Sequence, residues 1–335
     1  MYLIQNFSNQ KNSKITPFDR LVWLVGLIHY KSFGYKTKIY CTEEDVEFLK
    51  ENYFLEYYDE VDTETLSNCK WLDNINEDYF WFFRKIVCME NEFKLQHKFI
   101  YSDTDIILKE PVDLENCDLL VWGLENVGNE EEQTLYCPWN EISMPPNYTM
   151  PEYIKNTTSI NYNCGLLYFK NPDVFYKWKE DMLQFAKNNP CEIYADYLYQ
   201  FDAVFACNCE QRILKGLSQH LNLQVQAIDT EAYSMGITPK GAHFYAWRSI
   251  WRTMSRREEW AKQNMELWQQ AVGFNWAVIA KLADFTEDLL NELKEKQFLF
   301  EWVRFMNNPD IHDLLSIEGI YRKILNWGNK KEEAQ

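Results

Sequence analysis

Residues 98–108, with the sequence KFIYSDTDIIL, constrain the fold more than any other stretch. The run is apolar, stops at Asp103 and Asp105, and then resumes, which is typical of a buried strand that ends at a pair of acids. In a strand, side chains two residues apart point to the same face, so both carboxylates should be aimed at one point. The stretch therefore predicts a strand inside a sheet, with a polar site at its carboxyl end.

The elements around this stretch alternate between strands and helices. Strand patterns occupy residues 2–7, 36–42, 117–126, 161–171, 223–229 and 241–247, with a weaker strand or turn at 53–61. Helical patterns occupy residues 12–35, 42–52, 76–93, 172–188 and, with a break near the cysteines, 194–222. Strands separated by helical stretches predict an α/β fold, in which a mainly parallel sheet has helices on its faces.

The first helical segment carries signals for both of its ends. Thr16 is placed as an N-cap, Pro17 as the first helical residue and Gly34 as the C-terminal stop. Residues 125–160 are polar and contain several prolines, which favours a long functional loop or flap. From about Arg248 the pattern is wholly helical, so we expect a domain over residues 1–248 and a helical appendage over residues 249–335.

Composition excludes some classes of function. The formal charge of −17 argues against nucleic acid as a partner, because phosphate binding requires a basic surface. The nine cysteines are scattered without paired CxxC spacing, which favours reduced thiols over a disulfide or zinc framework. The N-terminus lacks the features of a signal peptide, and no apolar run is long enough for a transmembrane segment. We therefore expect a cytoplasmic globular protein.

The aspartate pair has two interpretations. Acids at a strand end can simply cap the following loop. However, the carboxyl edge of the sheet is where open α/β proteins bind ligands, and carboxylate oxygens suit Mg²⁺ or Mn²⁺. Such a cation usually keeps water ligands and takes substrate phosphates as further ligands. The apolar residues on both sides of Asp103 and Asp105 favour the metal site.

The strand ending in YSDTDIIL, the basic helix before it and the segment NCGLLYF about sixty residues later resemble the GT-A glycosyltransferases. The nearest groups are the glycogenin-like and capsular-polysaccharide sugar transferases. The resemblance covers roughly residues 1–250 and implies a GT-A-like mixed, mainly parallel sheet. It implies that Asp103 and Asp105 hold Mn²⁺ or Mg²⁺ on the diphosphate of a nucleotide sugar. A DxD motif alone is weak, and the ordered series of elements makes it more specific.

The resemblance extends to residues that would bind the donor. Arg84 or Lys85, on the helix before the motif, would approach the nucleotide or its phosphates, although a solvated helix face is the alternative for either. Asn163 and Gly165 match the segment beside the sugar, where an amide bonds hydroxyls and glycine permits close backbone approach. Asn161 is the alternative asparagine.

Later in the chain the match is partial. Glu210 and Gln211 match the family's acid-glutamine pair, usually Asp-Gln, and are the catalytic candidates; an acid stabilised by a helix N-terminus is the alternative. His243 is the candidate third metal ligand, with a packed core histidine as the alternative. The family then has a glycine followed by a lysine that grips the diphosphate. Here Ala246 stands at the glycine position, and the nearest cation is Arg248.

These residues predict a hexosyltransferase-type enzyme that moves a sugar from a nucleotide-diphosphate donor to a hydroxyl acceptor, such as a glycan in polysaccharide synthesis. Two other functions stay open. A haloacid-dehalogenase-type phosphatase also has a DxD motif after a strand, but it requires Thr or Val where this chain has Ile107. A non-catalytic GT-A-like carbohydrate-binding protein would keep the fold without turnover. The C-terminal helices are candidates for peripheral membrane or homo-oligomer contact.

Overall fold

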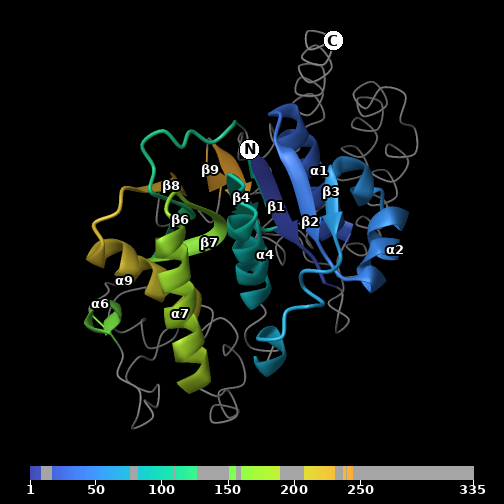
Figure 1. Cartoon of the computed structure of the whole chain (residues 1–335). Helices are drawn as coiled ribbons and strands as arrows, with labels where there is room; N and C mark the ends of the chain where they lie inside the picture. Colours follow the sequence, from blue (N-terminus) through green and yellow to red (C-terminus); the bar gives the residue numbers. More distant parts are fainter. Residues whose placement is uncertain are drawn as a thin grey trace, which may run out of the picture. The chain divides into compact units, whose positions relative to one another are not determined.

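The computed structural model describes residues 1–8, 17–75, 82–108, 110–126, 151–155, 160–188, 207–230, 237–238 and 240–243 (Figure 1). The predicted α/β class is confirmed: seven strands form a mixed, mainly parallel sheet that is accompanied by helices. A second sheet has three strands. The predicted appendage over residues 249–335, its boundary at residue 248 and most of the predicted flap lie outside the described residues.

The chain divides into two compact units, and each unit combines segments that are distant in sequence. The first consists of Met1–Glu64, Ser102–Val112 and the described residues after Ser234. The second consists of Thr65–Tyr101 and Asp113–Tyr233. No helix among the described residues is long and apolar enough to cross a membrane.

The first unit is built from alternating strands and helices near the N-terminus (blue in Figure 1). Its strands are β1 (Tyr2–Asn6), β2 (Lys36–Tyr40) and β3 (Glu60–Asp62), and its helices are α1 (Pro17–Ser32), α2 (Glu43–Glu51) and the 3-10 turn η1 (Phe54–Tyr57). The strands are parallel and lie in the order β3-β2-β1. This βαβ arrangement confirms the alternation expected from the sequence.

Local signals explain where these helices begin and end. Helix α1 begins at Pro17, as predicted, and the chain leaves it through Gly34, whose φ of 78° lies in the left-handed region that favours glycine. Helix α2 begins with a capping box, in which Asp45 Oδ2 accepts hydrogen bonds from the backbone N–H and the hydroxyl of Thr42 at 3.0 and 2.8 Å. Thr16 lies outside the described residues.

The three-stranded sheet also belongs to the first unit. It contains β5 (Ile106–Leu108), β9 (Ile237–Thr238) and β10 (Gly241–His243), in the antiparallel order β5-β10-β9. Helix α1 packs against β5 so closely that a Cβ atom at Gly26 would lie 2.8 Å from the carbonyl oxygen of Ile106. Any larger residue at this crossing point would force α1 or β5 to shift.

The second unit contains the remaining elements of the large sheet and most of the longer helices. Its strands are β4 (Phe99–Ser102), β6 (Leu119–Asn126), β7 (Ile160–Phe169) and β8 (Val225–Asp229), in the order β4-β7-β6-β8. Its helices are α4 (Phe83–Lys94), α6 (Glu152–Lys155), α7 (Pro172–Asn188) and α9 (Ile213–His220), with a 3-10 turn η2 (Leu72–Asn74) and a π-helical turn η4 (Cys207–Arg212). β6 pairs antiparallel with β7 and parallel with β8.

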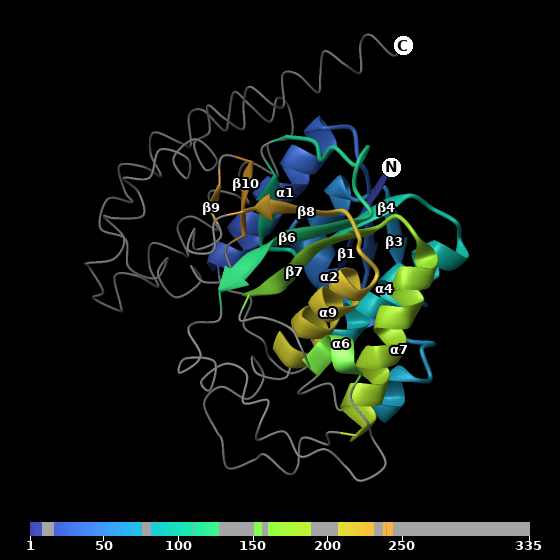
Figure 2. The same cartoon turned by 90° about the vertical axis from the view of Figure 1, so that its left-hand side faces the viewer.

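Aromatic side chains form the core of the second unit. Trp178 of α7 stacks on Phe169 of β7 at 5.3 Å between ring centroids, and Phe175 contacts Phe93 of α4 at 4.8 Å. Both Phe175 and Trp178 are fully buried. These contacts place α4 and α7 side by side, as Figures 1 and 2 show, and α6 lies beside α9. The apolar face of α7 therefore holds the helices and the sheet together.

Candidate functional site

The two aspartates lie in a turn that separates two strands. β4 ends at Ser102, residues 103–105 leave the ladder, and β5 begins at Ile106. The prediction that both acids lie within one extended strand is wrong, because residues 104 and 105 form a turn. The prediction that the acids follow the end of a buried strand is confirmed. Asp105 is buried and Asp103 is half-buried, so the turn has one enclosed carboxylate and one that reaches solvent.

Buried side chains hold the backbone of this turn. Gln5 Nε2 and Ser102 Oγ both donate to the carbonyl oxygen of Asp103, at 3.2 and 2.9 Å. The Tyr30 hydroxyl donates to the carbonyl oxygen of Ile106 at 2.6 Å and lies 3.0 Å from Ser102 Oγ. Gln5, Tyr30 and Ser102 are at most 1% exposed, so water does not compete for these bonds. The turn therefore has a fixed backbone.

Sequence reasoning missed Gln5 and Tyr30. Gln5 also accepts hydrogen bonds from Trp23 Nε1 at 3.2 Å and from the Tyr58 hydroxyl at 2.5 Å, so it links three elements to the turn. Burial raises the pKa of Tyr30 above its ordinary value, and the charge of Asp105 adds to this rise, so the hydroxyl remains a donor. The available signal was a polar or hydroxyl-bearing residue inside an otherwise apolar element, which predicts burial but names no partner.

The pairing of β10 with β5 brings the backbone of His243 next to the turn that contains the two aspartates. β10 pairs antiparallel with β5, and the register sets His243 opposite Ile106, the residue that follows Asp105. The His243 side chain and all of Arg248 lie outside what the structure describes. Among the described side chains, no three His, Cys, Asp or Glu residues gather as a metal site. The chain thus brings the predicted ligands Asp103, Asp105 and His243 together at the level of the backbone.

Lys85 and Glu210 meet inside the second unit. Lys85 Nζ lies 2.7 Å from Glu210 Oε1, and the two side chains are only 3% and 4% exposed. The same ammonium donates to the carbonyl oxygen of Cys164 at 3.1 Å and lies 5.2 Å from the centre of the Tyr101 ring. Arg84 is half-buried, so Lys85 is the predicted basic residue that faces the interior.

Strand β7 is irregular where the predicted asparagine and glycine lie. The ladder pairs Gly123 with Asn163 and Val121 with Leu167, so two steps along β6 span four steps along β7. Within this irregularity, Asn163 Oδ1 accepts the Gly165 N–H at 2.9 Å. The carbonyl oxygen that binds the lysine belongs to the same segment. Such irregularities re-aim side chains and are frequent beside active sites.

The catalytic candidates lie on the π-helical turn Cys207–Arg212, a geometry that is frequent at functional sites. The carbonyl oxygen of Glu210 accepts the Trp178 indole N–H at 3.1 Å, which anchors the turn to α7. Gln211 is half-buried, and its Oε1 accepts no hydrogen bond from the described residues. Asn161, the alternative asparagine, is buried like Asn163. Both asparagines are therefore interior residues of the second unit.

Further buried charges were not predicted from the sequence. Arg212 and Lys215 are both buried at the start of α9, and burial, together with the neighbouring Arg212, lowers the pKa of Lys215 to about 8. Asp229, at the end of β8, is also buried and lies opposite Gly123, where a Cβ atom would approach the Asp229 Cβ to 2.8 Å. The signal that could have revealed the two cations was their position among the apolar residues of RILKGL.

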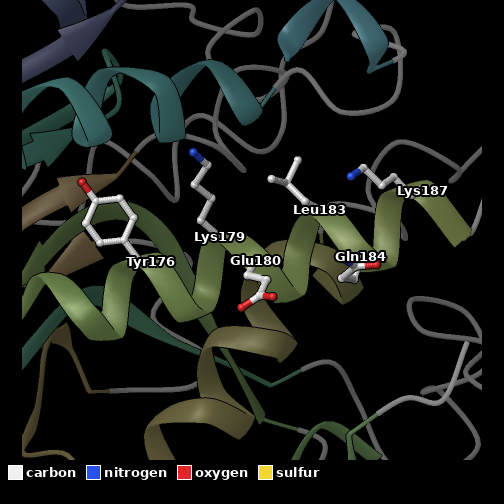
Figure 3. Close-up of a pocket in the computed structure, with 6 residues that line it drawn as sticks. All are labelled: Tyr176, Lys179, Glu180, Leu183, Gln184 and Lys187. Atoms are coloured by element: carbon white, nitrogen blue, oxygen red, sulfur yellow. The ribbon is translucent and has the colours of Figure 1, made fainter.

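A shallow groove of about 330 Å³ runs along α7 (Figure 3). Its lining residues are Tyr176, Lys179, Glu180, Leu183, Gln184 and Lys187. Lys179, Leu183 and Lys187 point to one side of the helix. Lys179 is held by Glu90 at 2.6 Å and by the Trp71 ring at 4.8 Å, so it is part of the packing between α7 and its neighbours. None of the candidate site residues lines this groove.

No protein-family model matches the chain, and a search of the curated proteins finds no match. The function is therefore inferred from the chemistry of the residues themselves. In the first unit, Asp103 and Asp105 supply carboxylate oxygens on a fixed turn, a donor set that fits Mg²⁺ or Mn²⁺. In the second unit, the buried pair of Lys85 and Glu210 lies beside the irregular segment that contains Asn163.

Proposed function

We propose that this protein is a metal-dependent GT-A-type glycosyltransferase that moves a sugar from a nucleotide diphosphate to a hydroxyl acceptor. The observation that carries the proposal is the register of β10 on β5, which sets His243 opposite Ile106, next to Asp105. A pair of acids that only capped a loop would need no third ligand nearby. The return of a histidine-bearing strand from a distant part of the sequence supports the metal site instead.

Asp103 and Asp105 would hold the cation, with His243 as the third protein ligand. A bound Mn²⁺ or Mg²⁺ would supply positive charge against the diphosphate as it leaves. Asp103 is half-buried, so it can face a ligand from solvent, while the enclosed Asp105 is kept in place by the packed turn. The acids would then act as fixed ligands that need little reorganisation when the donor binds.

The residues of the second unit would recognise the sugar, as the family resemblance implies. Asn163 Oδ1 accepts the Gly165 N–H, which orients the amide, and an amide is a group that can bond a sugar hydroxyl. Lys85 holds Glu210 and the Cys164 carbonyl at the same time, which stabilises the irregular segment that carries Asn163. The pair of Lys85 and Glu210 would therefore orient the residues that contact the sugar.

The proposal is tested by binding and by donor hydrolysis. Thermal unfolding with a panel of nucleotide sugars, each with and without Mn²⁺, should identify a donor that stabilises the protein only when the metal is present. At a hundredfold excess over Kd, one bound ligand adds about 2.7 kcal/mol to the free energy of unfolding. With that donor, Asp103→Ala and Asp105→Ala should each abolish metal-dependent hydrolysis. Glu47→Ala, which changes an exposed acid of α2, is the matched control and should keep full activity.

Three results would contradict the proposal. Retained hydrolysis in both aspartate variants would remove the metal site from the mechanism. Phosphate release from an aryl phosphate without any nucleotide sugar would favour the phosphatase alternative. Donor binding without hydrolysis or transfer to any acceptor would favour a carbohydrate-binding protein that has lost turnover.

A further inference from the structure

We infer that Tyr30 is a positioning residue for the metal-binding turn, because its hydroxyl ties together the two strand ends that carry Asp103 and Asp105. The inference depends on the proposed metal site and adds to it a residue outside the DxD motif. Tyr30 belongs to α1, and its contacts lie 72 and 76 residues further along the chain. It is therefore connected to the turn only through the tertiary structure.

The hydroxyl of Tyr30 reaches both sides of the turn. It lies 3.0 Å from Oγ of Ser102, the last residue of β4, and donates at 2.6 Å to the carbonyl oxygen of Ile106, the first residue of β5. Ser102 Oγ in turn lies 2.9 Å from the carbonyl oxygen of Asp103. The phenol proton serves Ile106, so the Ser102 proton is shared between Tyr30 and the Asp103 carbonyl. One connected set of hydrogen bonds thus spans residues 102–106.

The helix that carries Tyr30 is held firmly against β5. A Cβ atom at Gly26 would lie 2.8 Å from the same Ile106 carbonyl oxygen, and His29 Nδ1 lies 2.9 Å from the carbonyl oxygen of Leu108. Gly26, His29 and Tyr30 are spaced along one face of α1, since residues three and four apart lie on the same side of a helix. The helix therefore cannot slide along β5 without breaking these contacts, and the Tyr30 hydroxyl has a fixed place.

The separation of the two aspartates depends on this arrangement. Asp103 follows the β4 end and Asp105 precedes the β5 start, so a bond between the strand ends controls the distance between the carboxylates. Mg²⁺ requires oxygen ligands at about 2.0–2.1 Å in near-ideal geometry, and small shifts of its ligands weaken binding. Groups that orient metal ligands without touching the metal change its affinity by roughly 10–100-fold when they are removed.

The test compares two variants that each lose one buried hydroxyl. Tyr30→Phe keeps the ring and removes only the link to Ser102 and Ile106. Tyr35→Phe is the matched control, because Tyr35 is also buried in the first unit and its hydroxyl accepts the Val112 N–H at 2.9 Å, beyond β5. Mn²⁺ binding to the full chain is measured by calorimetric titration, and folding is checked by circular dichroism. We expect the Kd for Mn²⁺ to rise about tenfold in Tyr30→Phe and to stay within about twofold of wild type in Tyr35→Phe.

Each other outcome is decisive. Wild-type protein that binds no Mn²⁺ would overturn the proposed metal site and this inference with it. An unchanged Kd in Tyr30→Phe would overturn the role of Tyr30 and leave the metal site standing. Equal weakening of Mn²⁺ binding in both variants would also overturn the role of Tyr30, since the loss would then come from general destabilisation. If Tyr30→Phe does not fold, Ser102→Ala is titrated instead, and an unchanged Kd in that variant would refute the inference.

Discussion

Replacing Lys85 by methionine would leave the Glu210 carboxylate buried without its closest cation. The two charged atoms are 2.7 Å apart and the side chains are 3% and 4% exposed, so solvent cannot screen the loss. Breaking a buried ion pair by removing one partner typically costs about 3–5 kcal/mol. Glu210→Gln should cost a similar amount, because the buried ammonium would lose the carboxylate that compensates its charge. Either change removes a large share of an ordinary stability of about 5–15 kcal/mol.

The double variant Lys85→Met/Glu210→Gln distinguishes a true pair from two independent buried charges. If the costs were independent, they would sum to about 6–10 kcal/mol. Removing both charges leaves neither one uncompensated, so we expect the double variant to lose no more than either single variant. The coupling free energy should therefore be at least about 3 kcal/mol.

Urea unfolding of wild type and the three variants, followed by tryptophan fluorescence at one pH, gives the four free energies of the cycle. Arg84→Met is the control, because the neighbouring Arg84 is half-buried and should contribute at most about 1 kcal/mol. If the stability losses of the two single variants sum to the loss of the double variant within about 0.5 kcal/mol, the buried pair is refuted. A coupling as large as predicted would support the arrangement around the irregular part of β7.

Two further predictions concern one buried position in each unit. Gly26→Ala should destabilise the protein by about 1–3 kcal/mol through overpacking, despite a gain of about 1 kcal/mol in helix propensity, because the Ile106 carbonyl cannot move aside; a raised Tm would contradict this. The pKa of Lys215 is lowered from 10.5 to about 8, so the unfolded chain binds more protons between these values and wild-type stability recovers as pH rises through them. The stability advantage of Lys215→Met over wild type should therefore be largest below pH 8 and shrink by roughly 3 kcal/mol towards pH 10.5. Urea unfolding at a series of pH values gives the free energy of unfolding of both proteins. A difference between the two free energies that does not change with pH would contradict the prediction.

Local features of the sequence determined several of the element boundaries. Pro17 and Gly34 mark the two ends of α1, because each residue has backbone preferences of its own. The capping box of Thr42 and Asp45 sets the start of α2 within one turn of chain. The position of Asp103 at the end of a buried strand was also evident, since apolar periodicity predicts burial. These properties depend on neighbouring residues alone, so the sequence determines them directly.

The tertiary structure decided how the candidate sites are assembled. The DxD segment is a turn, and Gln5 and Tyr30, from elements far away in the chain, bind the carbonyl oxygens of Asp103 and Ile106. The register of β10 on β5 likewise brings His243 next to the turn. A sequence pattern shows that a polar side chain is buried, but many donors and acceptors could satisfy it. The partner is selected only when distant strands and helices pack, because hydrogen bonds require particular distances and directions.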